Sequence, residues 1–149
     1  LRTNVRLTRY TDYALRVLMY LAVSDKRCTI ADIADRYQIS KNHLMKVVQQ
    51  LNQQGYVSAT RGKSGGLQLG RDSSQINLGE LIRHTEADFS MVECFDPASD
   101  SCRLTQACRL KGIIDEALQA FLSVFDQYTL ADLIGNNKQH TQLVRLLNL

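Results

Sequence analysis

Apolar residues in the first third of the chain recur with the spacing of helices that bury one face. One stripe predicts a helix over residues 8–24 and consists of Leu15, Leu18, Met19 and Ala22. The stretch TIAD predicts a second, shorter helix, because Thr29 can cap it and Asp32 can reach back to complete a capping box. The apolar face of this helix ends near Tyr37.

A third stripe predicts a helix between Ser40, a good N-cap, and Gly55, which suits a left-handed helix end. Its apolar positions are Leu44, Val47, Val48 and Leu51. The opposite face carries Asn42, His43, Lys46, Gln49 and Gln53. No acidic residue occurs between Asp35 and Asp72 to repel phosphates. Two short helices and a sharp turn therefore indicate a helix-turn-helix with an outward face that can hydrogen-bond to base edges.

The glycine-rich stretch after the third helix predicts a β-hairpin. The segments YVSAT and LQL flank RGKSGG, and five of the eight glycines lie between residues 55 and 70. After a helix-turn-helix such a hairpin is a wing, and Arg61 and Lys63 at its tip can reach phosphates or a narrow minor groove. A nucleotide-binding phosphate loop is disfavoured, because RGKSGG lacks the full pattern and precedes a strand rather than a helix.

The second half of the chain predicts a short and a long helix around a loop. Asn77 caps a helix that ends near Glu86. A stripe of about four turns follows the loop and consists of Leu110, Ile113, Ile114, Ala117, Leu118, Phe121, Leu122 and Phe125. Such a stripe suits burial in a symmetric dimer, with packing against the chain's own winged domain as the alternative. Thr129 caps one further short helix, and the remaining tail is weakly amphipathic.

These elements predict a mainly α fold with a small β-wing, in which a winged helix-turn-helix domain is followed by a long dimerisation helix. The expected parts are a DNA-binding domain over residues 1–86, a cysteine-containing loop over 87–109, and a dimerisation helix with its C-terminal tail over 110–149. The 149 residues, 44% of them hydrophobic, support one compact unit. Residues 1–63 carry eleven Lys and Arg against four Asp, whereas residues 64–149 carry seven against eleven acids. The first half is therefore the candidate for binding a polyanion.

Three of the four cysteines lie close together in a polar stretch. Cys94, Cys102 and Cys108 are separated by seven and five residues, whereas the isolated Cys28 suits a buried structural position. No stretch resembles a signal peptide or is long enough to cross a bilayer, so a reducing cytoplasm and no membrane partner are expected. Thiols in that compartment stay free or bind metal. The spacing leaves an iron-sulfur cluster, a zinc site and a redox switch open.

The sequence predicts no enzyme. It contains no Ser-His-Asp order, no paired buried carboxylates and no nucleotide-binding fingerprint. The histidines are scattered: His43 suits a groove-facing position, His84 a helix end and His140 the surface.

Several stretches resemble the winged-helix iron-sulfur transcription regulators, nearly from end to end of the chain. The stretches are RLTRYTDYALRVLMYLA, ISKNHLMKVVQQLNQQGYVSATRGKSGGLQLG, ACRLKGIIDEALQAF and YTLADLI. The most specific part is RGKSGG with three following cysteines and ACRL. LTRYTDYALR, SKNHLMKVV and DQYTLADL resemble the nitric-oxide-sensing branch most closely, and FSMVECF resembles an iron-responsive branch.

The resemblance implies a homodimer with an iron-sulfur cluster, a four-iron cluster being favoured over a two-iron cluster. The cluster ligands implied are Cys94, Cys102, Cys108 and Asp12 of the partner subunit. From the residues alone, Asp12 better suits a first-turn acid that the helix dipole stabilises. The cluster-biogenesis branch uses a histidine just past the last cysteine, but here Arg109 and Leu110 follow Cys108. The seven-residue gap before Cys102 is longer than expected for the nitric-oxide-sensing branch.

The function implied is that of a transcriptional repressor that binds palindromic operator DNA while its cluster is intact. Nitric oxide would nitrosylate the iron, break the link to Asp12 and release the DNA. The residues expected near DNA are Ser40, Lys41, Asn42, His43, Lys46, Arg61, Lys63 and Ser64. The alternatives are an iron- or redox-responsive regulator of the same family and a cluster-free thiol switch.

Overall fold

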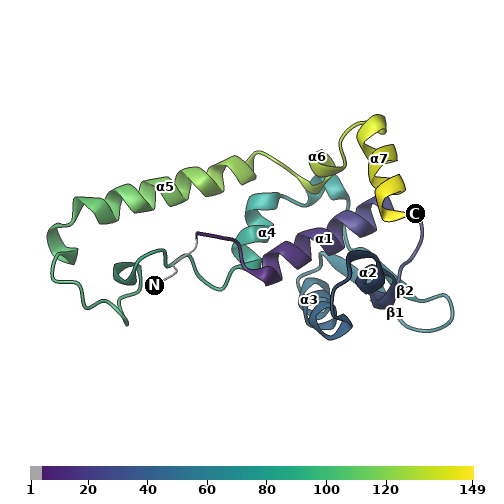
Figure 1. Ribbon diagram of the computed structural model, residues 1–149, viewed down its shortest axis with the longest axis horizontal. Coiled ribbons are helices and arrows are strands. Elements are labelled where there is room, and N and C mark those ends of the chain that lie inside the picture. Colours follow the sequence, from purple (N-terminus) through teal and green to yellow (C-terminus); the bar gives the residue numbers. More distant parts are fainter. Residues whose placement is uncertain (1–4) are drawn as a thin grey trace.

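The computed structural model describes residues 5–149 and contains seven α-helices and one two-stranded antiparallel sheet within them. In chain order the elements are α1 (Arg9–Val23), α2 (Ile30–Tyr37), α3 (Lys41–Gln53), β1 (Val57–Thr60), β2 (Gly66–Leu69), α4 (Leu78–Thr85), α5 (Arg109–Asp126), α6 (Leu130–Ile134) and α7 (Asn137–Leu147). Figure 1 shows α5 reaching out from a body formed by the other helices and the hairpin, with the α4–α5 loop running out from α4 to the far end of α5. The predicted mainly α fold with a small β-wing is confirmed.

The helix starts follow the local chemistry of the sequence. The predicted capping box of α2 forms: the Thr29 side chain accepts from the Asp32 N–H at 3.1 Å, and the Asp32 carboxylate accepts from the Thr29 N–H at 2.8 Å. Hydrogen bonds from the Thr29 backbone and side chain to the carboxylate lower the pKa of Asp32. Ser40 occupies the N-cap position of α3, but its side chain makes no capping hydrogen bond. Gly55 follows α3 with φ +78°, the left-handed conformation expected there.

The wing is a regular hairpin with an added bridge from the start of α2. β1 and β2 pair from Val57 opposite Leu69 to Thr60 opposite Gly66. Cys28 forms an isolated bridge with Leu67 through hydrogen bonds of 3.1 and 2.7 Å. Cys28 is 3% exposed, so its predicted structural position is confirmed.

The main core gathers residues from both ends of the chain around α1. Its fully buried side chains include Ala14, Val17, Leu18, Ile33, Leu44, Leu51, Ile76, Leu81 and Leu130. Leu130 belongs to α6, which packs against α1, and Leu147 of α7 contacts the same core. The tail that follows α5 therefore returns to the N-terminal body instead of extending the long helix. The boundaries between the three expected parts stay predictions.

The predicted apolar stripe of α5 divides into two. One side packs against α4, with Leu118 and Leu122 joining Ile82 in a second small cluster. The other side stays open, and its large exposed residues are Leu110, Ile113, Phe121 and Val124. Packing against the chain's own domain, the alternative to dimer burial, therefore accounts for one side of the helix and leaves the other unpartnered within residues 5–149. None of the helices described here has the length and apolar character needed to cross a membrane.

Candidate functional site

The residues expected near DNA lie on two exposed segments. Five of them are at the start and outer face of α3: Ser40, Lys41, Asn42, His43 and Lys46. Three lie in the turn between β1 and β2: Arg61, Lys63 and Ser64. All eight side chains are exposed, and Figure 1 shows α3 and the hairpin on the side of the body away from α5. Their contact with DNA stays a prediction.

The orientation of α3 follows from its buried face. Leu44, Val47, Val48 and Leu51 are all buried in the main core. Because an α-helix turns about 100° per residue, burial of this face directs the polar face outward. The side-chain oxygen of Asn52 accepts a hydrogen bond from the Ala59 N–H at 3.3 Å and ties α3 to the first strand of the wing.

Two arginines that the sequence did not single out attach the wing to the body. Arg27 donates to the Thr60 hydroxyl at 2.6 Å. Arg71 donates to the Gln54 carbonyl at 2.9 Å, and its guanidinium carbon lies 4.6 Å from the centre of the Tyr56 ring. No sequence spacing marks these partners, because they lie 33 and 17 residues apart.

Asp12 lies in the first turn of α1 and is paired within its own helix. The Arg16 guanidinium donates to its two carboxylate oxygens at 3.1 and 2.9 Å, and both side chains are about half exposed. The spacing of four residues could have identified this partner from the sequence. The Arg16 guanidinium also lies 5.9 Å from the centres of the Tyr13 and Tyr37 rings. The carboxylate therefore already accepts hydrogen bonds on both oxygens before any metal binds.

The three loop cysteines are free thiols held by a hydrogen-bonded loop. Cys94 lies in a single 3₁₀ turn, Cys102 is exposed, and Cys108 is the N-cap residue of α5. Asp100 organises the loop, because one of its carboxylate oxygens accepts from the Cys102 N–H at 3.0 Å and from the Thr105 hydroxyl at 2.9 Å. None of the three thiols belongs to the two clusters of buried residues.

The donor chemistry of this loop fits an iron-sulfur cluster, since three thiols are free of disulfides and outside the core. Among the residues described, however, no group of three His, Cys, Asp or Glu side chains is close enough to hold a metal ion. Figure 1 places α1 in the body, whereas the loop runs from α4 along α5 to the far end of that helix. A ligand set that includes Asp12 therefore requires a rearranged loop or a second chain.

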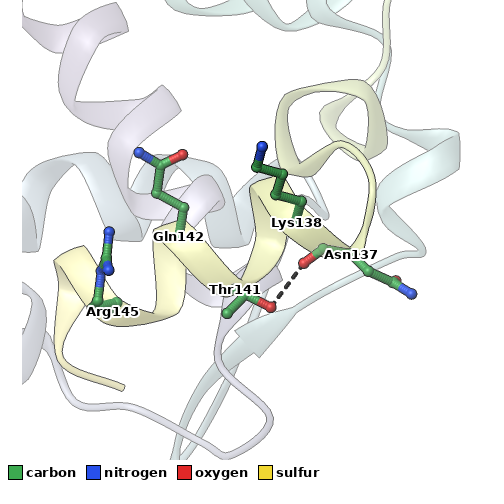
Figure 2. Close-up of a pocket in the computed structure, with 5 residues that line it drawn as sticks. All are labelled: Asn137, Lys138, Thr141, Gln142 and Arg145. Atoms are coloured by element: carbon green, nitrogen blue, oxygen red, sulfur yellow. Dashed lines mark hydrogen bonds between the residues drawn. The ribbon is translucent and has the colours of Figure 1, made fainter.

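An open pocket of about 530 Å³ on α7 contains none of the predicted site residues. Figure 2 shows Lys138, Gln142 and Arg145 pointing to the same side of the helix. The Thr141 hydroxyl donates to the Asn137 carbonyl at 2.8 Å, a bond within the helix itself. The pocket brings no nucleophile and base together, so its geometry supports no catalytic role.

Comparison with known proteins places the chain among bacterial regulators. The model of the Rrf2 family, described as iron-dependent transcriptional regulator, matches residues 7–136. A Bacillus licheniformis protein named HTH-type transcriptional regulator NsrR is 51% identical over 142 residues, which are 94% of this chain and 99% of that protein. The Bacillus subtilis protein of the same name is 48% identical over 144 residues, or 95% and 99% of the two chains.

A solved structure supports the same fold. The crystal structure of a regulator from Listeria innocua, described as a putative transcriptional regulator, matches with a TM-score of 0.72 and 26% identity. The match covers 89% of this chain and 88% of that one. The part of the chain that the family model matches includes α1, α3, the wing and all three loop cysteines.

Proposed function

Because this chain belongs to the Rrf2 family of transcriptional regulators, we propose that it is a homodimeric DNA-binding repressor that senses nitric oxide through an iron-sulfur cluster. The family resemblance inferred from the sequence motifs is confirmed. The observation that carries the proposal is the pairing of two features: a recognition helix, α3, that contains no acid, and a loop that contains three free thiols.

The DNA-binding part of the proposal rests on charge and exposure. The start of α3, from Ser40 to Lys46, enters the major groove, and the wing tip with Arg61, Lys63 and Ser64 meets the flanking minor grooves. The excess of basic residues in the first 63 positions supplies the sequence-independent attraction to phosphates.

A second copy of this chain covers the open stripe of α5. Exposed apolar residues at positions 110, 113, 121 and 124 follow the 3- and 4-residue steps of one helix face. A helix that presents one apolar face pairs most simply with the same face of a two-fold-related copy. The dimer then sets the spacing between the two recognition helices.

The cluster ligands in this proposal are Cys94, Cys102, Cys108 and Asp12 of the partner subunit. The bound cluster, a four-iron one in preference to a two-iron one, supplies iron that reacts with nitric oxide. Asp12 offers oxygen, a harder and weaker donor to iron than thiolate, so its link is the one most readily lost. Arg16 of the same helix donates hydrogen bonds to this carboxylate, and it would hold the carboxylate again once the link to iron is lost. The tie between the loop of one subunit and α1 of the other then disappears.

Two alternatives have observations of their own. The description of the matched family as iron-dependent favours a regulator that responds to iron supply. The three thiols are free and do not gather into a metal site among the residues described, which favours a cluster-free thiol switch.

The decisive experiment purifies the protein without oxygen, measures iron, sulfide and visible absorption, and titrates nitric oxide while DNA binding is followed. The DNA is a duplex selected by the protein from a random pool. Loss of the visible band together with DNA release supports the proposal. A colourless protein that binds DNA favours the thiol switch, and a coloured one that responds to iron chelation but not to nitric oxide favours iron sensing.

A matched pair of variants tests the ligand assignment. Cys102→Ala removes an exposed loop thiol, so it should lose iron while circular dichroism stays that of the wild type. Cys28→Ala makes the same chemical change in the core and should retain iron. Equal iron content in Cys102→Ala and the wild type would remove Cys102 from the ligand set.

A further inference from the structure

A small pocket lies between the first turns of α1 and the exposed side of α3. Its volume is about 140 Å³. Its walls are Arg9, Tyr10 and Tyr13 from α1 and His43, Lys46 and Val47 from α3. The sequence predicts a DNA contact for His43 and Lys46 but for no residue of α1. The pocket thus adds a wall from α1 to the surface that α3 presents.

The pocket is a site of positive charge. Arg9 and Lys46 are exposed, and neither forms an ion pair with another residue in the range 5–149. Asp12 is the only acid of α1, and the Arg16 guanidinium holds its carboxylate. No acidic side chain of the described residues lines the pocket. Two uncompensated cations beside a concave wall attract an anion.

The same wall contains a hydrogen-bond donor without a partner. The Tyr10 hydroxyl is buried and has no hydrogen-bond partner in the described chain. Burial raises the pKa of Tyr10, so the phenol keeps its proton and remains a donor at neutral pH. This oxygen is closed off from solvent, so the two exposed cations, and not the hydroxyl, supply the contacts to an anion.

The two walls are held together before any ligand arrives. The rings of Tyr13 and His43 are 6.2 Å apart between centroids and tilted by 56°. The main core packs α1 directly against α3. A site whose walls are already packed loses little conformational freedom on binding, which favours affinity.

We propose that this pocket binds a backbone phosphate of duplex DNA, with Arg9 contacting the strand beside the groove that α3 enters. The inference rests on the DNA binding proposed above. Arginine and lysine donors are groups that proteins use for DNA phosphates. A free phosphate shares this chemistry, but His43 and Lys46 place the pocket on the face proposed for DNA. Residues of α1 as well as of α3 would then contact the DNA strand.

The test measures how the affinity of the full-length wild-type dimer for a mixed-sequence duplex changes with salt. Each phosphate that a protein neutralises contributes about 0.9 to the slope of log affinity against log salt. Because a dimer carries Arg9 twice, Arg9→Gln should lower the slope by about 1.8, so that its affinity deficit at 50 mM salt is about 12 times that at 200 mM. Arg9→Lys keeps the charge and should retain the wild-type slope. Lys138→Gln, the same loss of charge on α7, should also leave the slope unchanged.

The outcomes separate this inference from the proposed function. If the wild type binds DNA but Arg9→Gln keeps its slope, or Lys138→Gln loses as much, the phosphate contact is wrong and the function stands. If the wild type does not bind duplex DNA, the proposed function itself fails. Calorimetry with inorganic phosphate identifies the remaining source: an Arg9-dependent signal without a change in the DNA slope would assign the pocket to a free phosphate and overturn the inference.

Discussion

The N-terminal body buries its apolar side chains within the chain, whereas the α5 arm leaves several of them exposed. In the body, α1 packs against α3, α4, α6, α7 and β2, and its core side chains are buried. On α5, Leu118 and Leu122 are buried, while Leu110 and Ile113 are 61% and 56% exposed. A surface completed within one chain stabilises the fold, whereas a surface left open needs a partner. The comparison separates the part of the molecule that buries its apolar surface within the chain from the part proposed to pair with a second copy.

The two regions meet at α4, which is joined to each by a different kind of bond. Toward the body, the Thr11 hydroxyl donates to the Thr85 hydroxyl at 2.9 Å in a fully buried contact. Toward the arm, Arg83 forms two hydrogen bonds with Asp126, and both side chains are about 40% exposed. A buried hydrogen bond is costly to break, whereas an exposed ion pair is weak and screened by salt. The exposed ion pair therefore contributes less to the junction than the buried hydrogen bond or the buried cluster of Ile82, Leu118 and Leu122.

The largest expected effect tests whether the tail belongs to the body. Leu130 is fully buried although it follows the arm in sequence. Leu130→Ala should lower the free energy of unfolding by about 2 to 5 kcal/mol, because it leaves a cavity in the main core. Chemical denaturation measures the loss. The control Leu146→Ala, at a position 65% exposed, should change it by less than about 0.5 kcal/mol. If both variants lose equally little free energy of unfolding, the tail does not contribute to the core.

An intermediate effect tests the open surface of the arm. Ile113→Asp places a charge in the stripe proposed to pair with a second copy. It should raise the dimer dissociation constant about 30-fold, or about 2 kcal/mol, with unchanged helix content. Sedimentation measures the dissociation constant. Gln119→Asp makes a similar change on the polar side of α5 and should leave assembly intact. If the Ile113→Asp variant dimerises with the dissociation constant of the wild type, the interface lies elsewhere.

The smallest expected effect concerns the exposed bond at the junction. Hydrogen bonds from Arg83 hold the pKa of Asp126 below its ordinary value of 3.8. Since the folded pKa is depressed, the pair contributes stability above pH 3.8 and loses it as the pH falls through the lowered pKa. Arg83→Gln should return the pKa of Asp126 toward 3.8, as carboxyl titration by NMR measures. An unmoved pKa would show that Arg83 is not its cause.

Local chemistry explains how much of this structure could be predicted. The capping box of α2, the left-handed Gly55 after α3 and the glycine-rich hairpin depend on neighbours a few residues apart. The same holds for the outer face of α3. Cys28 was correctly expected to be buried, but its bridge to Leu67 joins residues far apart in the sequence. The partner of Asp12 was missed although it is also local, because the acid was weighed as a metal ligand without the arginine four residues on.

In the candidate site too, the residues marked by local spacing could be predicted, and those brought together by packing could not. Side-chain type and spacing marked the three loop cysteines and the basic residues of α3 and the wing. The wall that α1 adds to α3 was not predicted, because Arg9 and Lys46 lie 37 positions apart and become neighbours only when the two helices pack. The attachment of the wing by Arg27 and Arg71 was missed for the same reason.

The sequence alone determined α1 to α6, the hairpin and the face that α3 buries, because helix period, capping and turn chemistry act within a few residues. Its prediction for α1 was wrong in part, since the structure buries Ala14, Val17, Leu18 and Leu21 and leaves Leu15, Met19 and Ala22 only partly buried. Only the tertiary structure decided that the α5 stripe divides into a packed and an open side, that the tail returns to the core, and that Arg9 lines a pocket beside α3. These outcomes depend on which distant surfaces compete for the same apolar contacts, and that competition is settled by the packing of the whole chain.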